Sequence, residues 1–346
     1  MRRDFNQTLR LFDYRLPPDL IAQKPASPRD SARLLAYFRK DKKTAFGSFL
    51  NLPDYLPKNA VLVFNQTKVI PARLPVYKIS GGKIQLLYLS RGKNFIEVLS
   101  NRPLATGLKL FFSLKDANGP HFTVQQKNQG IYRLKPGFNL ANVNKIFQKF
   151  GLTPLPPYIK HSPLSEKQKR AAYQTMFAKT GESVAAPTAS LHFTPRLLAR
   201  LKQRGIKIKF VRLDVNLGTF AKLTEKHVAA GRLHQEKYFI GAATAKYLAA
   251  AKKQGRPIIA VGTTVIRTLE TYGQTKKLSG STDLFIRPGF KFKVIDGLIT
   301  NFHVPKSSLM MLVSALTGRE KLLTLYASAM KKGFRFFSFG DGMLIV

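Results

Sequence analysis

The segment from Asp296 to Glu320 carries polar residues of several chemical types in a short loop between two apolar stretches. The loop residues able to bind a ligand or move a proton are Thr300, Asn301, His303, Lys306, Ser307 and Ser308. The run before them, FKVIDGLIT, predicts a strand, and Leu309 to Leu316 predicts a buried helix ending near Gly318. Unpaired N–H groups at a helix start can hold an anion or a polar ligand. A well-capped core turn is the alternative interpretation.

Two further segments carry groups suited to acid-base chemistry. Gly181 to Thr194 is rich in small residues that let a ligand approach the backbone, and its His192 could transfer a proton. A packed turn with a structural histidine would have the same pattern. His234 and Glu236 share one face of a predicted strand, but no second histidine stands at a spacing typical of zinc sites. We therefore expect no metal site.

The charge balance predicts a polyanionic partner. The 346 residues include 58 Lys and Arg against 18 Asp and Glu, a formal net charge of +40. Nucleic acid is the first candidate because phosphate contacts dominate such binding, although a general lysine bias would give the same count. Between Ser183 and Leu213 lies a basic stripe on a predicted helix and strand, either a phosphate-binding surface or a solvated face. The stripe consists of Arg196, Arg200, Lys202, Arg204, Lys207, Lys209 and Arg212.

Composition and motifs exclude several classes of protein. The absence of cysteine excludes disulfides, thiolate metal sites and cysteine nucleophiles. No apolar run approaches the ~18–20 residues that span a bilayer, and Met1 to Tyr14 lacks the apolar core of a signal peptide. Rossmann, P-loop and α/β-hydrolase motifs are absent. We expect a cytoplasmic protein without membrane contact, and a monomer.

The elements that position these residues fall into two groups. From about Val61 to Pro136, short apolar runs alternate with turn residues such as Ser80-Gly81-Gly82, which predicts an antiparallel sheet or small closed barrel. After a helix over Asn142 to Phe150 and the proline-rich LTPLPPYIK, helices and strands alternate. Thr194 and Pro195 predict one helix start, and the strand RPIIAVG runs into the helix TTVIRTLETYG. We expect an α/β main domain of residues 1–65 and 152–346, with a β-barrel domain inserted at 66–151.

A series of segments spread over nearly the whole chain matches a known family in composition and order. They are FDYRLPPDLIAQKP, RDSARLL, LVFNQTKVIPARL, PLPPYI, YQTMFA, SVAAPTASLHFT, GTF at Gly218, LHQE, VGTTVIRTLE, DLFIRPGF, LITNFHVPKSSL and FRFFSFGDGMLI. Together they resemble the S-adenosylmethionine:tRNA ribosyltransferase-isomerases, the QueA family of queuosine biosynthesis. The resemblance implies an α/β domain interrupted by a Greek-key antiparallel β-barrel, in agreement with the layout expected from the residues.

The resemblance also implies a reaction. Family members transfer and isomerise the ribosyl moiety of S-adenosylmethionine onto a 7-aminomethyl-7-deazaguanine base at the tRNA wobble position, forming epoxyqueuosine and releasing adenine and methionine. S-adenosylmethionine would then be a ribosyl-donor substrate, with no permanently bound cofactor, and tRNA would be the partner.

Roles can be assigned to the matching residues. His192 and His303 are the candidates for proton transfer, because the carbon beside the sulfonium must lose a proton. Asp341 and Glu236 would orient the amine or offset the sulfonium charge. The predicted contacts to S-adenosylmethionine are Thr188, Thr263, Thr264, Arg267, Asn301 and Ser307. The predicted contacts to tRNA are Arg29, Arg33, Arg196, Arg200, Lys202, Lys207 and Lys209, with Arg29 and Arg33 also able to hold the methionine carboxylate.

The chain departs from the family pattern at several positions. Asp214-Val215-Asn216 stands where members have His-Val-Gly before GTF, and Gly231 stands at a histidine position. Other replacements are Leu233 for methionine and Gln66 and Gln85 for acidic residues. These changes leave open a relative with reduced or altered activity. A basic RNA-binding protein without catalysis is the other alternative.

Overall fold

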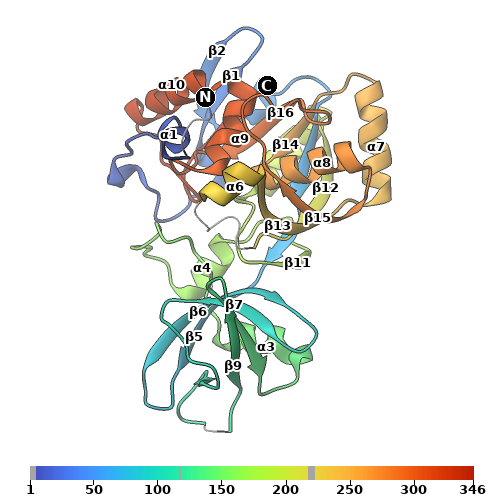
Figure 1. Ribbon diagram of the computed structural model, residues 1–346. Helices are drawn as coiled ribbons and strands as arrows, with labels where there is room; N and C mark the ends of the chain where they lie inside the picture. The colour runs from blue at the N-terminus through green and yellow to red at the C-terminus, as the bar shows by residue number, and fades with distance from the viewer. Residues whose placement is uncertain (1–4, 117, 217–222) are drawn as a thin grey trace.

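The computed structural model describes residues 5–116, 118–216 and 223–346, with an open sheet at one end and a closed barrel at the other (Figure 1). Within these residues the open sheet has nine strands, in the order β15-β13-β12-β3-β14-β16-β17-β1-β2. Strands β12, β3, β14 and β16 run parallel to one another. The strands are β1 (Arg33–Phe38), β2 (Lys43–Ser48), β3 (Val61–Asn65), β12 (Lys207–Leu213), β13 (Arg232–Phe239), β14 (Ile258–Val261), β15 (Ser279–Leu284), β16 (Gly297–Asn301) and β17 (Gly342–Ile345).

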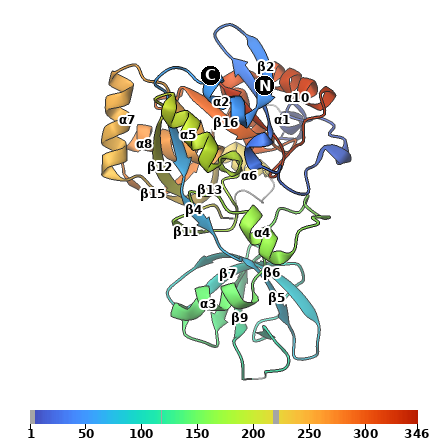
Figure 2. The same cartoon turned by 180° about the vertical axis from the view of Figure 1, so that it is seen from behind.

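Helices cover both faces of this sheet because its central strands are apolar on both sides. Val61 and Val63 of β3 pack into one core, whereas Leu62 and Phe64 pack into a second core on the opposite face. The first core is completed by α7 (Ala242–Lys253), α8 (Thr263–Thr275), α9 (Ser308–Thr317) and α10 (Arg319–Lys331). The second is completed by α2 (Leu52–Tyr55) and α5 (Pro195–Gln203), and α5 lies in front of the sheet in Figure 2.

The barrel is a Greek key. Its strands are β5 (Arg73–Tyr77), β6 (Lys83–Arg91), β7 (Ile96–Ser100), β8 (Lys109–Phe111), β9 (His121–Asn128) and β10 (Ile131–Pro136), closed in the order β10-β7-β6-β5-β8-β9. Strands β5 to β7 form a meander and β8 returns beside β5, which is the defining connection of a Greek key. Helix α3 (Val143–Phe150) contributes Val143 and Phe147 to the barrel core. The predicted Greek-key barrel is confirmed.

The chain enters and leaves the barrel at one place. The N–H of Arg73 donates to the carbonyl of Leu152 (3.2 Å), and the N–H of Leu152 donates to the carbonyl of Arg73 (2.7 Å). Between the sheet and the barrel in both views lies α4 (Glu166–Ala172), and a parallel pair is formed by β4 (Thr67–Val69) and β11 (Thr180–Ser183). The limits 1–65, 66–151 and 152–346 stay a prediction. The remaining helices are α1 (Phe5–Arg10) and α6 (Glu225–Ala230).

The local signals for helix ends are confirmed, but one strand prediction was too long. Thr194 caps α5 by accepting from the N–H of Leu197, and Gly318 follows α9 with φ of +79°. Within FKVIDGLIT, β16 begins only at Gly297. The buried carboxylate of Glu270 accepts the preceding backbone donors, the N–H groups of Lys293, Val294 and Ile295 at 2.8–3.0 Å. Those donors are therefore not free for strand pairing.

No helix among the described residues combines the length and the apolar character needed to cross a bilayer.

Candidate active site

A cavity of about 480 Å³ lies where the parallel strands end. Its lining includes Val215 after β12, Gly262 after β14 and Asn301 at the end of β16. Ligands commonly bind outside the carboxyl ends of parallel strands, because the loops there can diverge without breaking the sheet. We call this space the sheet-edge cavity. Eight of the predicted site residues line it: Thr188, Glu236, Thr263, Thr264, Arg267, Asn301, His303 and Ser307.

The start of α8 forms one wall of the sheet-edge cavity. Strand β14 turns into the helix at Gly262, whose φ of +99° suits glycine alone among common residues. The N-cap residue, Gly262, has no side chain to cap this helix, and Thr263 and Thr264 stand at its first turn. Thr264 Oγ1 accepts from Asn65 Nδ2 at 3.2 Å, which ties the turn to the end of β3. The N-terminus of α8 therefore faces the cavity with its positive dipole end.

The loop between β16 and α9 forms another part of the cavity wall. Ser307 is the N-cap of α9, since its Oγ accepts from the N–H of Met310 at 3.3 Å and donates to the carbonyl of Val304 at 2.7 Å. His303 Nε2 lies 2.8 Å from Thr300 Oγ1. Burial lowers the pKa of His303 to about 4, so this imidazole is neutral near pH 7. The loop thus presents a neutral histidine held by a capped turn.

Asn301 presents an unpaired acceptor. Its Nδ2 is surrounded by three acceptors: His192 Nε2 at 3.3 Å, the Phe337 carbonyl at 3.0 Å and the Asp341 carbonyl at 3.5 Å. This arrangement fixes the orientation of the amide. Asn301 Oδ1 is buried and has no hydrogen-bond partner among the residues that the structure describes. A buried acceptor without a partner costs stability and calls for a ligand or a water.

His192 lies behind Asn301 and does not line the sheet-edge cavity. Its ring stacks on Phe49 with centroids 4.0 Å apart. Burial first, and then the positive charges of Arg335 and Arg29, lower the pKa of His192 to about 3. The neutral ring must accept at Nε2 from Asn301, so its proton resides on Nδ1. The arrangement suits positioning of Asn301 more than proton transfer to a ligand.

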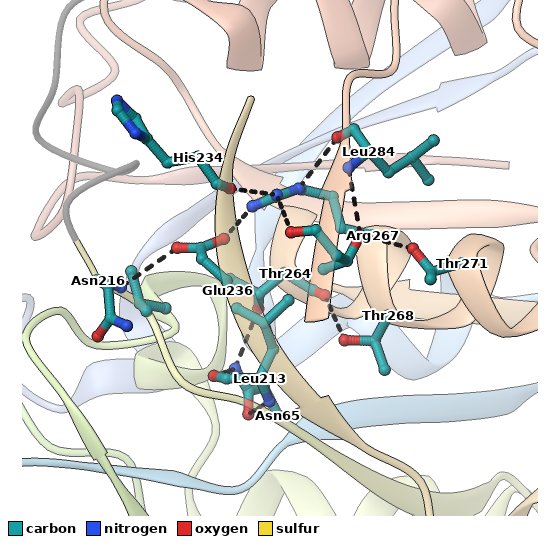
Figure 3. A network of polar contacts seen from close by, with 12 residues as sticks. Asn65, Leu213, Asn216, His234, Glu236, Thr264, Arg267, Thr268, Thr271 and Leu284 are labelled. Carbon is teal, nitrogen blue, oxygen red and sulfur yellow. Dashed lines mark hydrogen bonds and ion pairs between the residues drawn. The ribbon is translucent and has the colours of Figure 1, made fainter. Parts of the chain in front are cut away.

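Glu236 and Arg267 form a buried ion pair in the cavity wall (Figure 3). The two side chains are 1% and 9% exposed, respectively. Arg267 also donates to the carbonyls of Leu284 and Thr282 at 3.2 Å, and Glu236 Oε1 accepts from the N–H of Asn216 at 3.2 Å. Most of the hydrogen-bonding capacity of Arg267 is therefore used within the protein.

Asp341 lies outside the sheet-edge cavity and holds the backbone. Its carboxylate accepts from the N–H groups of Arg33 at 3.0 Å and Arg335 at 2.7 Å, and the residue is 1% exposed. The geometry thus brings His303 and Glu236 to the cavity, while His192 and Asp341 support it from behind.

None of the residues predicted to bind tRNA lines the cavity. Arg196 forms a two-pronged ion pair with the buried Asp30. Arg29 donates to the carbonyls of Ala171 and Gln174, and Arg33 donates to that of Lys332. Arg200 donates to the carbonyl of Leu50, Lys209 lies over the ring of Tyr247, and Lys202 and Lys207 are exposed. The arginines of this set are thus committed to partners inside the protein.

Comparison with known proteins assigns the family. The sequence profile described as "Queuosine biosynthesis protein" matches residues 9–345. The chain is 44% identical over 338 residues to the S-adenosylmethionine:tRNA ribosyltransferase-isomerase of Aquifex aeolicus, covering 97% of this chain and 98% of that one. It is also 44% identical over 346 residues to the protein of the same name from Carboxydothermus hydrogenoformans, covering 98% and 99%.

A solved structure is similar over the same length. The crystal structure of S-adenosylmethionine tRNA ribosyltransferase from Thermotoga maritima aligns with a TM-score of 0.56 at 32% identity, covering 97% of this chain and 100% of that one. The chain belongs to the queuosine biosynthesis protein family.

Residues that depart from the family pattern lie directly after β12, at the end of α6 and in the sheet-edge cavity. Asp214 Oδ1 accepts from Thr67 Oγ1 at 2.7 Å, and Gly231 ends α6 with φ of +63°. Leu233 lines the sheet-edge cavity. The GTF segment at Gly218 lies outside the described residues. At the two positions where the family pattern has histidine, this chain thus has an acid that pairs with Arg212 and a glycine that ends a helix.

Sequence reasoning missed the aromatic part of the cavity in this queuosine biosynthesis protein. Tyr158, Phe337 and Ser338 line it, and Tyr158 Oη lies 2.7 Å from Ser338 Oγ. Burial raises the pKa of Tyr158 to about 12, so it is a neutral phenol. Pro156 also lines the cavity, so the proline-rich segment LTPLPPYIK contributes directly to it. The tyrosine inside PLPPYI was the signal in the sequence that could have identified this part of the cavity.

Among the described residues, no group of three or more metal-ligating side chains is placed to hold a metal ion.

Proposed function

We propose that this protein transfers and isomerises the ribosyl moiety of S-adenosylmethionine onto 7-aminomethyl-7-deazaguanine at the wobble position of tRNA. The products are epoxyqueuosine-tRNA, adenine and methionine. The observation that carries the proposal is the sheet-edge cavity in a chain that matches the family profile over residues 9–345. Its volume of about 480 Å³ falls in the range of roughly 300–1,000 Å³ typical of small-molecule sites. We further propose that the protein holds no permanently bound cofactor and acts as a monomer in the cytoplasm.

Asn301 and His303 are the residues we assign to the reacting end of the donor. Asn301 Oδ1, buried and unpaired, would accept a hydrogen bond from an N–H of the adenine or of the attacking amine. His303 is the histidine that lines the cavity, and its neutral ring can accept the proton released beside the sulfonium. His192 acts as a positioning residue that holds the Asn301 amide.

The start of α8 is the place we assign to the methionine carboxylate. The helix lacks a side-chain cap, and a carboxylate there is stabilised by the helix dipole and by free N–H groups. Thr263 and Thr264 would add hydroxyl contacts. Arg267 instead pairs with Glu236, whose carboxylate also lines the cavity and would offset the positive sulfonium.

The test is product release from purified protein. Incubation with S-adenosylmethionine and tRNA bearing the aminomethyl-deazaguanine base should release adenine and methionine in equal amounts, and tRNA with guanine at that position should release none. Asn301→Leu should lower kcat/KM roughly 10- to 100-fold, because a substrate donor loses its acceptor. The exposed Asn128→Leu is the matched control. A folded protein that binds this tRNA but releases no adenine would favour the re-purposed relative.

A further inference from the structure

A second, larger space lies between the barrel and the open sheet. This interdomain groove has a volume of about 1,130 Å³. The barrel side is formed by residues of β6 and by the exposed face of α3, including Lys145 and Lys149. The other side is formed by β4, β11 and the ends of β12 and β13, including Lys68 and Lys237. The barrel and the open sheet therefore each form one side of the groove.

The interdomain groove is lined by more positive than negative side chains. Its lining holds six basic and two acidic side chains. The two acids are already paired, Glu182 with Arg91 at 2.9 Å and Asp214 with Arg212 at 3.5 Å. Glu182 accepts further hydrogen bonds from Tyr88 and Asn144. The other four basic residues form no ion pair with any described residue: Lys68, Lys145, Lys149 and Lys237.

The groove and the sheet-edge cavity share a wall. After β12, the side chains of Asp214 and Asn216 line the groove, while Val215 between them lines the cavity. On the neighbouring β13, Lys237 lines the groove and Glu236 lines the cavity. This follows from the alternation of side chains along extended chains, and the N–H of Asp214 donates to the carbonyl of Lys237 at 3.0 Å. One layer of backbone therefore separates the two spaces.

We propose that the interdomain groove binds the phosphate backbone of the RNA whose base reacts in the sheet-edge cavity. This inference rests on the proposed function, which supplies RNA as the substrate. Lysines that form no ion pair with a described residue line both sides of the groove, an arrangement that suits a chain of phosphates better than a single small anion. Asn144, Gln148 and Ser90 add neutral hydrogen-bonding groups for riboses or bases. The basic stripe on α5 and β12 is the competing surface, but its arginines are held by internal partners such as Asp30.

The test compares two variants that lose the same charge. The groove variant combines Lys68→Gln, Lys145→Gln, Lys149→Gln and Lys237→Gln, all at exposed positions that do not support the core. The control variant combines Lys202→Gln and Lys207→Gln of the stripe with Lys246→Gln and Lys253→Gln of α7, also exposed. Binding of an unmodified tRNA transcript is measured over a series of salt concentrations, without S-adenosylmethionine.

The groove variant should bind at least about tenfold more weakly at about 100 mM salt, and its log–log salt slope should fall by about 3. The control should stay within about twofold of the unmodified protein. Equal weakening of both variants, or unchanged binding by the groove variant, would overturn the proposal. Displacement of the tRNA by polyglutamate as readily as by polyuridylate of equal charge would also overturn it, in favour of an acidic protein partner.

The outcomes separate this inference from the proposed function. Protein that loses tRNA binding in the groove variant but never releases adenine refutes the function and keeps the groove. Protein that releases adenine, with the same KM for modified tRNA in the groove variant and the unmodified chain, keeps the function and refutes the groove.

Discussion

Acid should destabilise this protein through two buried histidines, and replacing either one should remove a defined part of that sensitivity. His192 and His303 have pKa values lowered to about 3 and about 4, mainly by burial. In the unfolded chain the same groups titrate near ~6.5. Below about pH 6.5 the two histidines are protonated in the unfolded state but stay neutral in the folded state. The stabilisation is therefore complete above about pH 6.5 and is lost as the pH falls toward the folded pKa values.

The magnitude follows from the size of the shifts. Each proton taken up by the unfolded state costs the folded state about 1.4 kcal/mol per pH unit. Between pH 7.5 and pH 5 each histidine should therefore account for about 2 kcal/mol of the free energy of unfolding, and the pair for about 4 kcal/mol. His192→Gln and His303→Gln should each remove about half of this pH dependence, and the double variant should remove nearly all of it.

Urea-induced unfolding between pH 5 and pH 7.5 measures the effect, followed by circular dichroism because the chain has no tryptophan. The slope of unfolding free energy against pH is the deciding quantity, and it is independent of any constant loss caused by the substitution. An unchanged slope in His192→Gln would refute the assignment of a buried neutral ring. An acid limb of kcat/KM near pH 6–7 that disappears in the same variant would show proton transfer by His192.

Three further substitutions test other parts of the structure. Glu236→Leu leaves Arg267 charged and buried, so the free energy of unfolding should fall by about 3–5 kcal/mol, and adding Arg267→Leu should restore much of it in urea titrations. Glu270→Ala removes an acceptor of three backbone N–H groups, which should cost about 3 kcal/mol or more without changing affinity for tRNA in a filter-binding assay. Gly181→Ala would place a Cβ 2.2 Å from Asp214 Oδ1 at a φ of +104°, so it should lower both the melting temperature and the rate of adenine release.

Local chemistry in the sequence was sufficient for much of the fold. The Thr194–Pro195 pair marked the start of α5, and Gly318 marked the end of α9, because caps depend on the nearest few residues. Regular spacing of short apolar runs predicted the barrel, although the first run, at Val61, forms β3 of the open sheet instead. The predicted start of β16 was wrong because the N–H groups before Gly297 donate to the carboxylate of Glu270. Glu270 is more than twenty residues away in the chain, so the sequence did not indicate this contact.

The candidate site was partly visible for a topological reason. Residues after β14 and within the β16–α9 loop come together because parallel strands end at one edge of a sheet. The direction of a side chain cannot be read from the sequence, and so His192 and Asp341 were predicted as catalytic residues although they lie behind Asn301 and do not line the cavity. The ion-pair partners of the basic stripe could not be predicted for a similar reason. Arg196, for example, pairs with Asp30, which is 166 positions away in the sequence.

The hydrogen-bonded pair of Arg73 and Leu152 means that the two ends of the barrel segment are neighbours in space. A tight turn could join them after removal of everything between, since antiparallel partners need only about two connecting residues. The barrel is then a replaceable module, and the same junction can carry another one. Recognition of the nucleic acid and chemistry on the donor would in that case be exchangeable traits of one scaffold.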